Sequence, residues 1–321
     1  MGAYLFVHFV GTESTPEHEQ IYFSVSKDGQ SWQILNGGKN ILTSDVGELG
    51  VRDPYIIRSV DGSKFYLVAT DLSIYQRMQF EDGKDAWRQC TYAVPNNPHP
   101  GSKGMVIWES EDLVHWSRAR LVQTAPAAAG CFWAPKCIWD KEKAAYMVVG
   151  ASKMPEDGYK WLRLYRTYTL DFRKFTEPEL YIDLSLNRPE DKKRHVFDCV
   201  LTECDGRYYR IYKSDCIQMD VADSLSGDWQ PVDTNIHLLA PNHEGPAICR
   251  EGGKKTWMLM LDCLTTHGGY QPFYIEDMQS GQFIENADRV HFPSDVKYRH
   301  GSILAISHEE YERLITSFTV K

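Results

Sequence analysis

Short apolar runs alternate with polar turns along the whole chain, and almost no segment has the periodicity of a helix. Several apolar runs are joined by dipeptides that favour tight hairpin turns, because such turns need residues that tolerate positive φ. These dipeptides are Asp61-Gly62, Asp205-Gly206 and Gly252-Gly253. The pattern predicts successive antiparallel strand pairs. A short helix at 307–314 is the exception, since it opens on a capping-box pattern.

One segment recurs five times: a strand, a polar turn with an aspartate, and an aromatic residue. The closing aromatics are Trp32, Trp116, Phe175, Trp229 and Phe283. About four short strands fall in each repeat of roughly 55 residues, which predicts an all-β fold, a five-bladed β-propeller with antiparallel blades around a central funnel. We interpret the closing aromatics as packing residues of the blades.

The two ends of the chain are predicted to share the last blade. Segments 3–9 and 21–25 have the pattern of outer strands, and 301–306 has that of an innermost strand. The first repeat is the longest, which indicates an insertion at about 73–102, and long loops on a rigid scaffold usually border a site. The chain is then a single propeller domain, 1–321.

Composition is that of an ordinary globular protein, with 42% hydrophobic and 25% charged residues. The net charge of -9 disfavours nucleic acid as a partner. No apolar stretch approaches the ~20 residues of a membrane helix. The eight cysteines form no C-x-x-C pair, so buried free thiols are expected. We expect a monomer.

The sequence leaves the cellular compartment of the protein open. The sequence begins Met1-Gly2-Ala3, without the basic and apolar regions of a signal peptide. The protein is expected in the cytoplasm, or in the periplasm or outside the cell if a signal peptide has been removed.

The innermost strands of a propeller converge on the axis, so their first residues face one another. These residues are Asp53, Trp133, Asp198, Glu244 and His300, which we interpret as equivalent positions. Charges are rarely placed where a strand enters a core unless they have a function. Glycoside hydrolysis needs one carboxylate that activates water and one carboxyl that protonates the leaving oxygen. A third carboxylate would raise the pKa of the acid.

The motifs around these residues, in this order and at blade spacing, resemble glycoside hydrolase family 43 over essentially the whole chain. They are Asp53-Pro54, Trp133-Ala134-Pro135, Asp198 before an Asp-Gly hairpin, Glu244-Gly245-Pro246 and Arg299-His300-Gly301. The resemblance implies an inverting glycosidase, most often acting on arabinose- or xylose-containing glycans.

The resemblance also implies individual roles. Asp53 becomes the general base, Asp198 the pKa modulator and orienter, and Glu244 the general acid. His300 would lie in the central channel and hold water or, through water, a bound ion such as a structural calcium, while no cofactor is required. Trp133 would form an aromatic wall for the sugar.

Two residues depart from the family pattern. Lys136 follows Trp-Ala-Pro where relatives usually have an acidic residue, and Cys199 follows Asp198 in place of the usual proline or threonine. The three catalytic positions are intact, so we retain the activity. Lys136 leaves the local charge near a subsite, and hence the substrate, open.

Other residues are weaker candidates for substrate binding. They are Phe132, Arg299 and the loop aromatics Trp87 and Tyr75. Each has a simpler interpretation: the loop aromatics as exposed side chains, and Arg299 as a partner for a funnel carboxylate. Asp53 and Glu244 taken singly would be turn residues, and His300 a structural histidine.

The sequence favours an exo-acting α-L-arabinofuranosidase, because the 73–102 insertion could close one end of the funnel. A β-xylosidase, or another exo-glycosidase of the same fold, would use the same three carboxylates. A non-catalytic glycan-binding propeller is the alternative from another class. Nucleotide-binding, serine-hydrolase and zinc-protease motifs are absent from the sequence.

Overall fold

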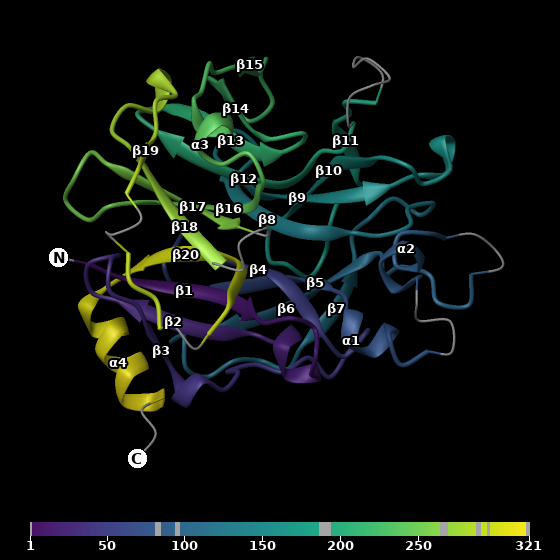
Figure 1. The fold of residues 1–321 in the computed structure, drawn as a ribbon, viewed down its shortest axis with the longest axis horizontal. Coiled ribbons are helices and arrows are strands. Elements are labelled where there is room, and N and C mark those ends of the chain that lie inside the picture. Colours follow the sequence, from purple (N-terminus) through teal and green to yellow (C-terminus); the bar gives the residue numbers. More distant parts are fainter. Residues whose placement is uncertain are drawn as a thin grey trace.

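The computed structural model describes residues 2–80, 85–93, 97–185, 194–263, 269–286, 290–293 and 296–318. Its strands form five four-stranded antiparallel sheets arranged in a ring, which confirms the five-bladed propeller (Figure 1). The first strand of each sheet contacts the first strands of its neighbours, so these strands surround the axis.

From the axis outward, the five sheets consist of β4 (Val51–Arg58), β5 (Phe65–Asp71), β6 (Gly104–Ser110) and β7 (Arg120–Gln123); β8 (Trp133–Asp140), β9 (Ala145–Lys153), β10 (Leu162–Thr169) and β11 (Glu179–Ile182); β12 (Phe197–Cys204), β13 (Arg207–Lys213), β14 (Ile217–Ala222) and β15 (Gln230–Pro231); β16 (His243–Arg250), β17 (Trp257–Cys263), β18 (Gly269–Ile275) and β19 (Ile284–Glu285); and β20 (Tyr298–Ile306), β1 (Ala3–Val10), β2 (Tyr22–Ser26) and β3 (Gln33–Ile34). The α-helices are α1 (Ile74–Arg77), α2 (Ala86–Gln89), α3 (Ile236–Leu239) and α4 (His308–Phe318).

The last blade closes the ring with both ends of the chain, as the sequence predicts. The C-terminal strand β20 lies at the axis and pairs with the N-terminal strand β1, with Val7 opposite Ser302. Every residue of β1 is buried, which fits its almost wholly apolar sequence. The predicted helix follows as α4, and Ser307 and Glu310 exchange the two hydrogen bonds of a capping box, of 3.1 and 2.7 Å.

Each innermost strand carries a β-bulge near its start, and these bulges position the site. On β4 the pairing register shifts between Arg52 and Tyr55, and corresponding shifts occur on β8, β12, β16 and at the β20–β1 pair. In four blades a bulge residue has left-handed backbone geometry, with φ between 49 and 57°: Asp53, Ala134, Asp198 and Gly245. A bulge bends its strand and redirects the adjacent side chains.

The register corrects one expectation from the sequence. Asp53 and Asp198 are equivalent, but Trp133 and Glu244 each lie one residue before the bulge residue of their strands. On β20 the residue equivalent to Asp53 is Arg299, and His300 lies one residue after it. The residues at the five strand starts therefore approach the axis from three successive backbone positions.

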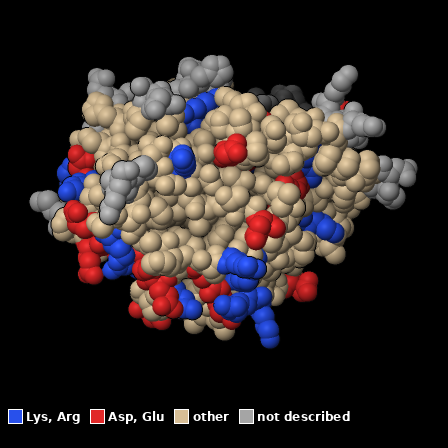
Figure 2. Space-filling model, turned by 90° about the horizontal axis from the view of Figure 1, so that it is seen from below, with Lys and Arg blue, Asp and Glu red and all other residues tan. Residues whose placement is uncertain are grey.

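The insertion runs between β5 and β6 of the first blade and contains α1 and α2. Residues 81–84 and 94–96 of this predicted segment lie outside the described residues. Among the described residues, no helix is long and apolar enough to cross a membrane. On the face seen in Figure 2, acidic and basic side chains are interspersed and form no large basic patch.

Candidate active site

A cavity of about 470 Å³ opens at the propeller axis. Its walls include Asp53, Asp198, Glu244 and His300 from four of the innermost strands. Trp133 from the remaining innermost strand also borders it, as does Trp87 from the insertion. The structure thus brings together all five residues at the strand starts around one space.

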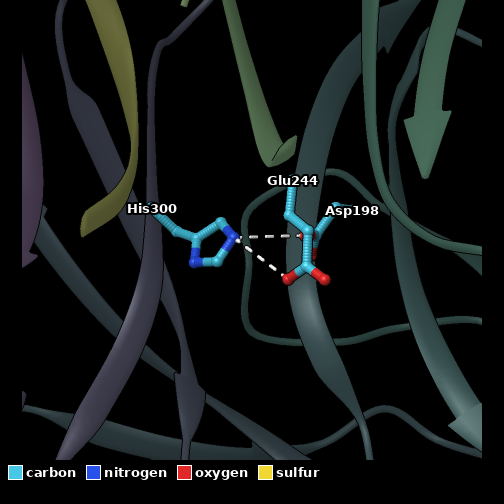
Figure 3. Close-up of side chains that lie close together, drawn as sticks. All are labelled: Asp198, Glu244 and His300. Atoms are coloured by element: carbon cyan, nitrogen blue, oxygen red, sulfur yellow. Dashed lines mark ion pairs between the residues drawn. The ribbon is translucent and has the colours of Figure 1, made fainter. Parts of the chain in front are cut away.

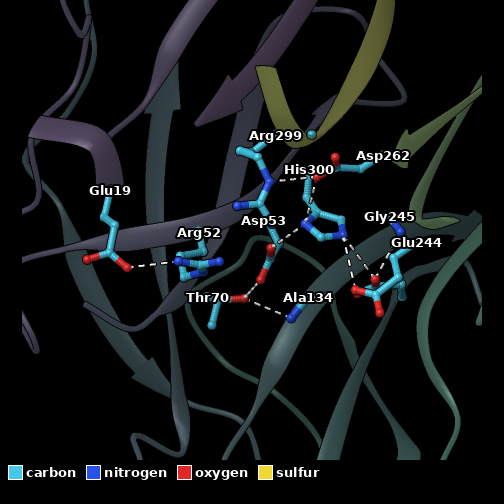
Figure 4. Close-up of polar contacts among 12 residues, drawn as sticks. Glu19, Arg52, Asp53, Thr70, Ala134, Glu244, Gly245, Asp262, Arg299 and His300 are labelled. Atoms are coloured by element: carbon cyan, nitrogen blue, oxygen red, sulfur yellow. Dashed lines mark hydrogen bonds and ion pairs between the residues drawn. The ribbon is translucent and has the colours of Figure 1, made fainter. Parts of the chain in front are cut away.

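His300 lies at the centre of the carboxylates (Figures 3 and 4). Its Nε2 atom is 3.4 Å from Asp198 Oδ2 and 3.9 Å from Glu244 Oε2, and its Nδ1 atom is 3.6 Å from both Asp53 Oδ1 and Asp262 Oδ2. Burial lowers the pKa of His300, but the surrounding carboxylates outweigh burial and raise the pKa to about 9. The ring is therefore a buried cation at neutral pH.

Asp53 is fixed by a short chain of hydrogen bonds. The Thr70 hydroxyl donates to Asp53 Oδ2 at 2.7 Å and accepts from the backbone N–H of Ala134 at 2.8 Å. Thr70 lies on β5 and Ala134 on β8, so two blades hold this carboxylate in place (Figure 4). The second oxygen, Oδ1, faces His300. A carboxylate held in one orientation can accept a proton from a positioned water.

Asp198 and Glu244 lie on the other side of the imidazole. Burial raises the pKa of Asp198, but the His300 cation, the Lys136 ammonium and the Gly245 N–H, which donates at 3.0 Å, together lower it. In contrast, burial and the Asp198 charge raise the pKa of Glu244 above its usual value. Environments that separate two carboxyl pKa values in this way favour one ionised group and one proton donor.

The two candidate catalytic carboxylates face each other across the imidazole ring. Asp53 contacts Nδ1 and Glu244 contacts Nε2, at 3.6 and 3.9 Å. With the width of the ring, these contacts limit the distance between the two contacting oxygens to roughly 10 Å, which is compatible with the ~6.5–9.5 Å of inverting glycosidases.

We expect Thr70→Val to reduce kcat roughly tenfold and leave KM almost unchanged, because Asp53 loses the donor that orients it and Thr70 does not line the cavity. Thr70→Ser keeps the hydroxyl and serves as the control. Steady-state kinetics on an aryl glycoside, with the melting temperature of each variant, measure the effect. A folded Thr70→Val variant with the kcat of Thr70→Ser would contradict this role.

Asp262 joins the site through His300, and the sequence prediction missed it. Its partner Arg299 was only a weak candidate for substrate binding. Asp262, on β17, is fully buried and accepts a hydrogen bond of 2.8 Å from Arg299 Nε. Arg299 is therefore a partner of a buried carboxylate, although it also lines the cavity. The available signal for Asp262 was a single charge within the apolar run 257–263.

An ion-pair cluster connects the insertion with the cavity wall. Glu19 accepts hydrogen bonds from Ser73 and from the backbone at the start of α1, and it pairs with Arg52 at 2.9 Å. The Arg52 guanidinium also pairs with Glu13 at 2.8 Å and lies over the Trp87 ring, 4.9 Å from its centre. The insertion is thus tied to the strand that carries Asp53.

The predicted aromatic residues divide into two groups. Trp87 and Trp133 both line the cavity and meet edge to face, with ring centres 6.3 Å apart. Phe132 and Tyr75 do not line it. The Phe132 ring is buried against Gly150, where even a Cβ atom would clash with it, so we correct its assignment to a packing residue.

Lys136 also lies elsewhere than the sequence suggested. It is almost fully buried and does not line the cavity, so it cannot set the charge of a sugar subsite by direct contact. Its ammonium lies behind the cavity wall, where it donates a long hydrogen bond of 3.5 Å to the backbone carbonyl of Asp53.

The donor set around His300 does not fit a directly bound calcium ion. One atom each from Asp198, Glu244 and His300 lie within 4.8 Å of one another. Calcium takes six to eight oxygen ligands, whereas this set offers three atoms, one of them nitrogen. We therefore derive no step through an ion.

Comparisons with known proteins identify the family and support the fold. The sequence profile of a family described as a probable glycosyl hydrolase domain, related to family 43, matches residues 1–312. The chain belongs to this family 43-related group of glycosyl hydrolases. Its membership confirms the resemblance drawn from the motifs.

Individual relatives are more distant. An α-L-arabinofuranosidase of Bifidobacterium longum is 27% identical over 231 residues, which cover 66% of this chain and 19% of the relative. A mutant of the family 43 protein BlXynB from Bacillus licheniformis has a TM-score of 0.57 at 17% identity, over 95% of this chain and 55% of that protein. An exo-β-1,3-galactanase from Clostridium thermocellum has a TM-score of 0.52 at 14% identity, over 79% and 52%. These structures share the fold, and this chain spans about a fifth to a half of the relatives' lengths.

Proposed function

We propose that this protein is an inverting, exo-acting glycoside hydrolase that releases terminal arabinofuranose, or a related pentose, from plant-type polysaccharides or oligosaccharides. The observation that carries the proposal is the placement of Asp53 and Glu244 on opposite sides of His300, at one cavity. Membership of a glycosyl hydrolase family and the distant arabinofuranosidase relative support it.

In the proposed mechanism a single displacement inverts the anomeric carbon. Asp53 accepts a proton from water while the water oxygen forms a bond to that carbon. The bond to the leaving oxygen breaks, its electron pair stays on that oxygen, and Glu244 supplies the proton. Burial and the Asp198 charge raise the pKa of Glu244, which favours its protonated form.

The cavity supports action on a terminal sugar. The insertion, with Trp87 half-exposed at the cavity, forms part of the wall and is tied to the strand of Asp53. Trp87 and Trp133 offer apolar ring faces, which suit the carbon side of a sugar. A β-xylosidase with the same carboxylates remains the runner-up.

A substrate panel tests this proposal. Aryl α-L-arabinofuranoside, aryl β-xyloside and aryl β-galactoside are compared with arabinan, xylan and arabinogalactan, and the products are identified by chromatography. We expect release of single arabinose units. Release of xylose or galactose alone would replace the assigned sugar. Calorimetric binding of a glycan with no product from any substrate would instead support a non-catalytic glycan-binding propeller.

Removing metal ions is expected to leave the rate within twofold, because His300 already supplies a cation among the carboxylates. The measurement is kcat/KM after dialysis against a chelator, and again after calcium is restored. A large loss that calcium reverses would show that an ion takes part.

A further inference from the structure

The buried amine of Lys136 is an anomaly. Packing does not require it, and the proposed mechanism gives it no direct role. Lys136 is the first paired residue after the bulge of β8. The register gives the equivalent residues on the other innermost strands: Tyr55, Val200, Ala247 and Gly301. All four are uncharged, so the fold does not require a cation at this position.

Lys136 has little direct compensation for its burial. Among the described residues, its hydrogen bond is the long one to the Asp53 carbonyl, and no carboxylate lies within ion-pair distance. The ammonium is also 5.5 Å from the centre of the Tyr55 ring. Burying an ammonium costs far more than burying an apolar side chain of similar length, and a methionine could fill the same space.

The charges that act on the ammonium include those of the two equivalent bulge carboxylates. Burial lowers the pKa of Lys136, and the charges of Asp53 on β4 and Asp198 on β12 oppose this shift. The thiols of Cys137 and Cys199 also interact with the ammonium, and burial keeps them neutral by raising their pKa values. Lys136 therefore supplies positive charge behind the cavity, whereas His300 supplies it at the cavity wall.

We propose that Lys136 is a positioning residue for the hydrolytic reaction, whose buried charge holds the Asp53 and Asp198 carboxylates in place at their bulges without touching the substrate. The inference rests on the proposed function, since it assigns those carboxylates to catalysis. Because Lys136 lies behind the wall, its loss should lower kcat and leave KM nearly unchanged.

The test compares Lys136→Met, Lys136→Gln and Lys136→Arg in steady-state kinetics on the best aryl glycoside. Met removes charge and donor, Gln keeps a donor without the charge, and Arg keeps the charge. We expect Met and Gln to lower kcat about ten- to a hundredfold with KM within twofold, and Arg to retain more activity than either.

Arg210→Met is the matched control, because Arg210 is a largely buried cation paired with Asp220 at 2.7 Å, outside the cavity lining. It should lower the melting temperature and leave kcat unchanged. Wild-type kcat in folded Lys136→Met or Lys136→Gln would overturn the proposal. So would failure of both to fold under conditions where Arg210→Met folds, since Lys136 would then serve the fold alone.

Asp53→Asn, measured beside these variants, distinguishes a failure of the role proposed for Lys136 from a failure of the proposed function. If Asp53→Asn is inactive while the Lys136 variants have normal kcat, only the role of Lys136 fails. If Asp53→Asn keeps the wild-type rate, the proposed function itself fails.

Discussion

Glu244→Gln is expected to lower kcat on oligosaccharides by about 10²–10⁴-fold, because the variant cannot protonate a leaving sugar oxygen. The amide is nearly isosteric with the acid, so the cavity keeps its shape. Burial and the Asp198 charge raise the pKa of Glu244, which favours the protonated form that a general acid needs. The measurement is kcat on an oligosaccharide beside kcat on a dinitrophenyl glycoside of the same sugar.

The second substrate is the internal control for Glu244→Gln. Dinitrophenolate leaves without a proton, so the variant should recover most of the wild-type rate on it. The wild-type rate should fall as pH rises through the raised pKa of Glu244, since the acid then loses its proton. With the dinitrophenyl substrate, the rate of Glu244→Gln should not fall as pH rises through this range. Equal losses on both substrates would contradict the assignment of Glu244 as the acid.

Asp53→Asn is expected to remove nearly all turnover, by 10³-fold or more, on both substrates. Without a carboxylate, water is neither oriented nor deprotonated, and a better leaving group cannot replace that step. The neighbouring Thr70 hydroxyl can still donate to the amide oxygen of the variant, so the fold should persist.

Substrate binding separates a catalytic effect from a structural one in this variant. Calorimetry with the released sugar should give a Kd for Asp53→Asn close to that of the wild type, and the melting temperature should change little. A folded Asp53→Asn variant that recovers on the dinitrophenyl glycoside would contradict the role of Asp53 as the base.

The sequence predicts the ring well because the features that specify it are local. Asp205-Gly206 needs only its own backbone geometry to make a hairpin, and the turn aromatics recur between the third and fourth strands of every sheet. The pairing of β1 with β20 also follows from apolar patterns at the two ends of the chain.

The register of the innermost strands could not be predicted in the same way. A bulge adds one residue without changing the local hydrophobic pattern, so the pattern predicts equivalent positions for Glu244 and Asp53 although they lie at different positions. A signal was present: Pro54, Pro135 and Pro246 each lie inside a strand, where proline is typical of a bulge.

The positions of Asp262 and Lys136 depend on packing between strands distant in sequence. Asp262 reaches His300 from a second strand of its blade, and Lys136 reaches Asp53 from the neighbouring blade. Neither contact has a local motif. The charge balance of the site, in which His300, Lys136 and Arg299 lie among four carboxylates, is therefore a result of the three-dimensional structure.

The stereochemistry of the first product tests the central claim most directly. Proton NMR can follow the early hydrolysis of an aryl α-L-arabinofuranoside, or of the active aryl glycoside from the panel, before the released sugar mutarotates. The proposed single displacement predicts that the first sugar has the opposite anomeric configuration to the substrate, here β-L-arabinofuranose. A first product with the substrate's own configuration would contradict the roles assigned to Asp53 and Glu244.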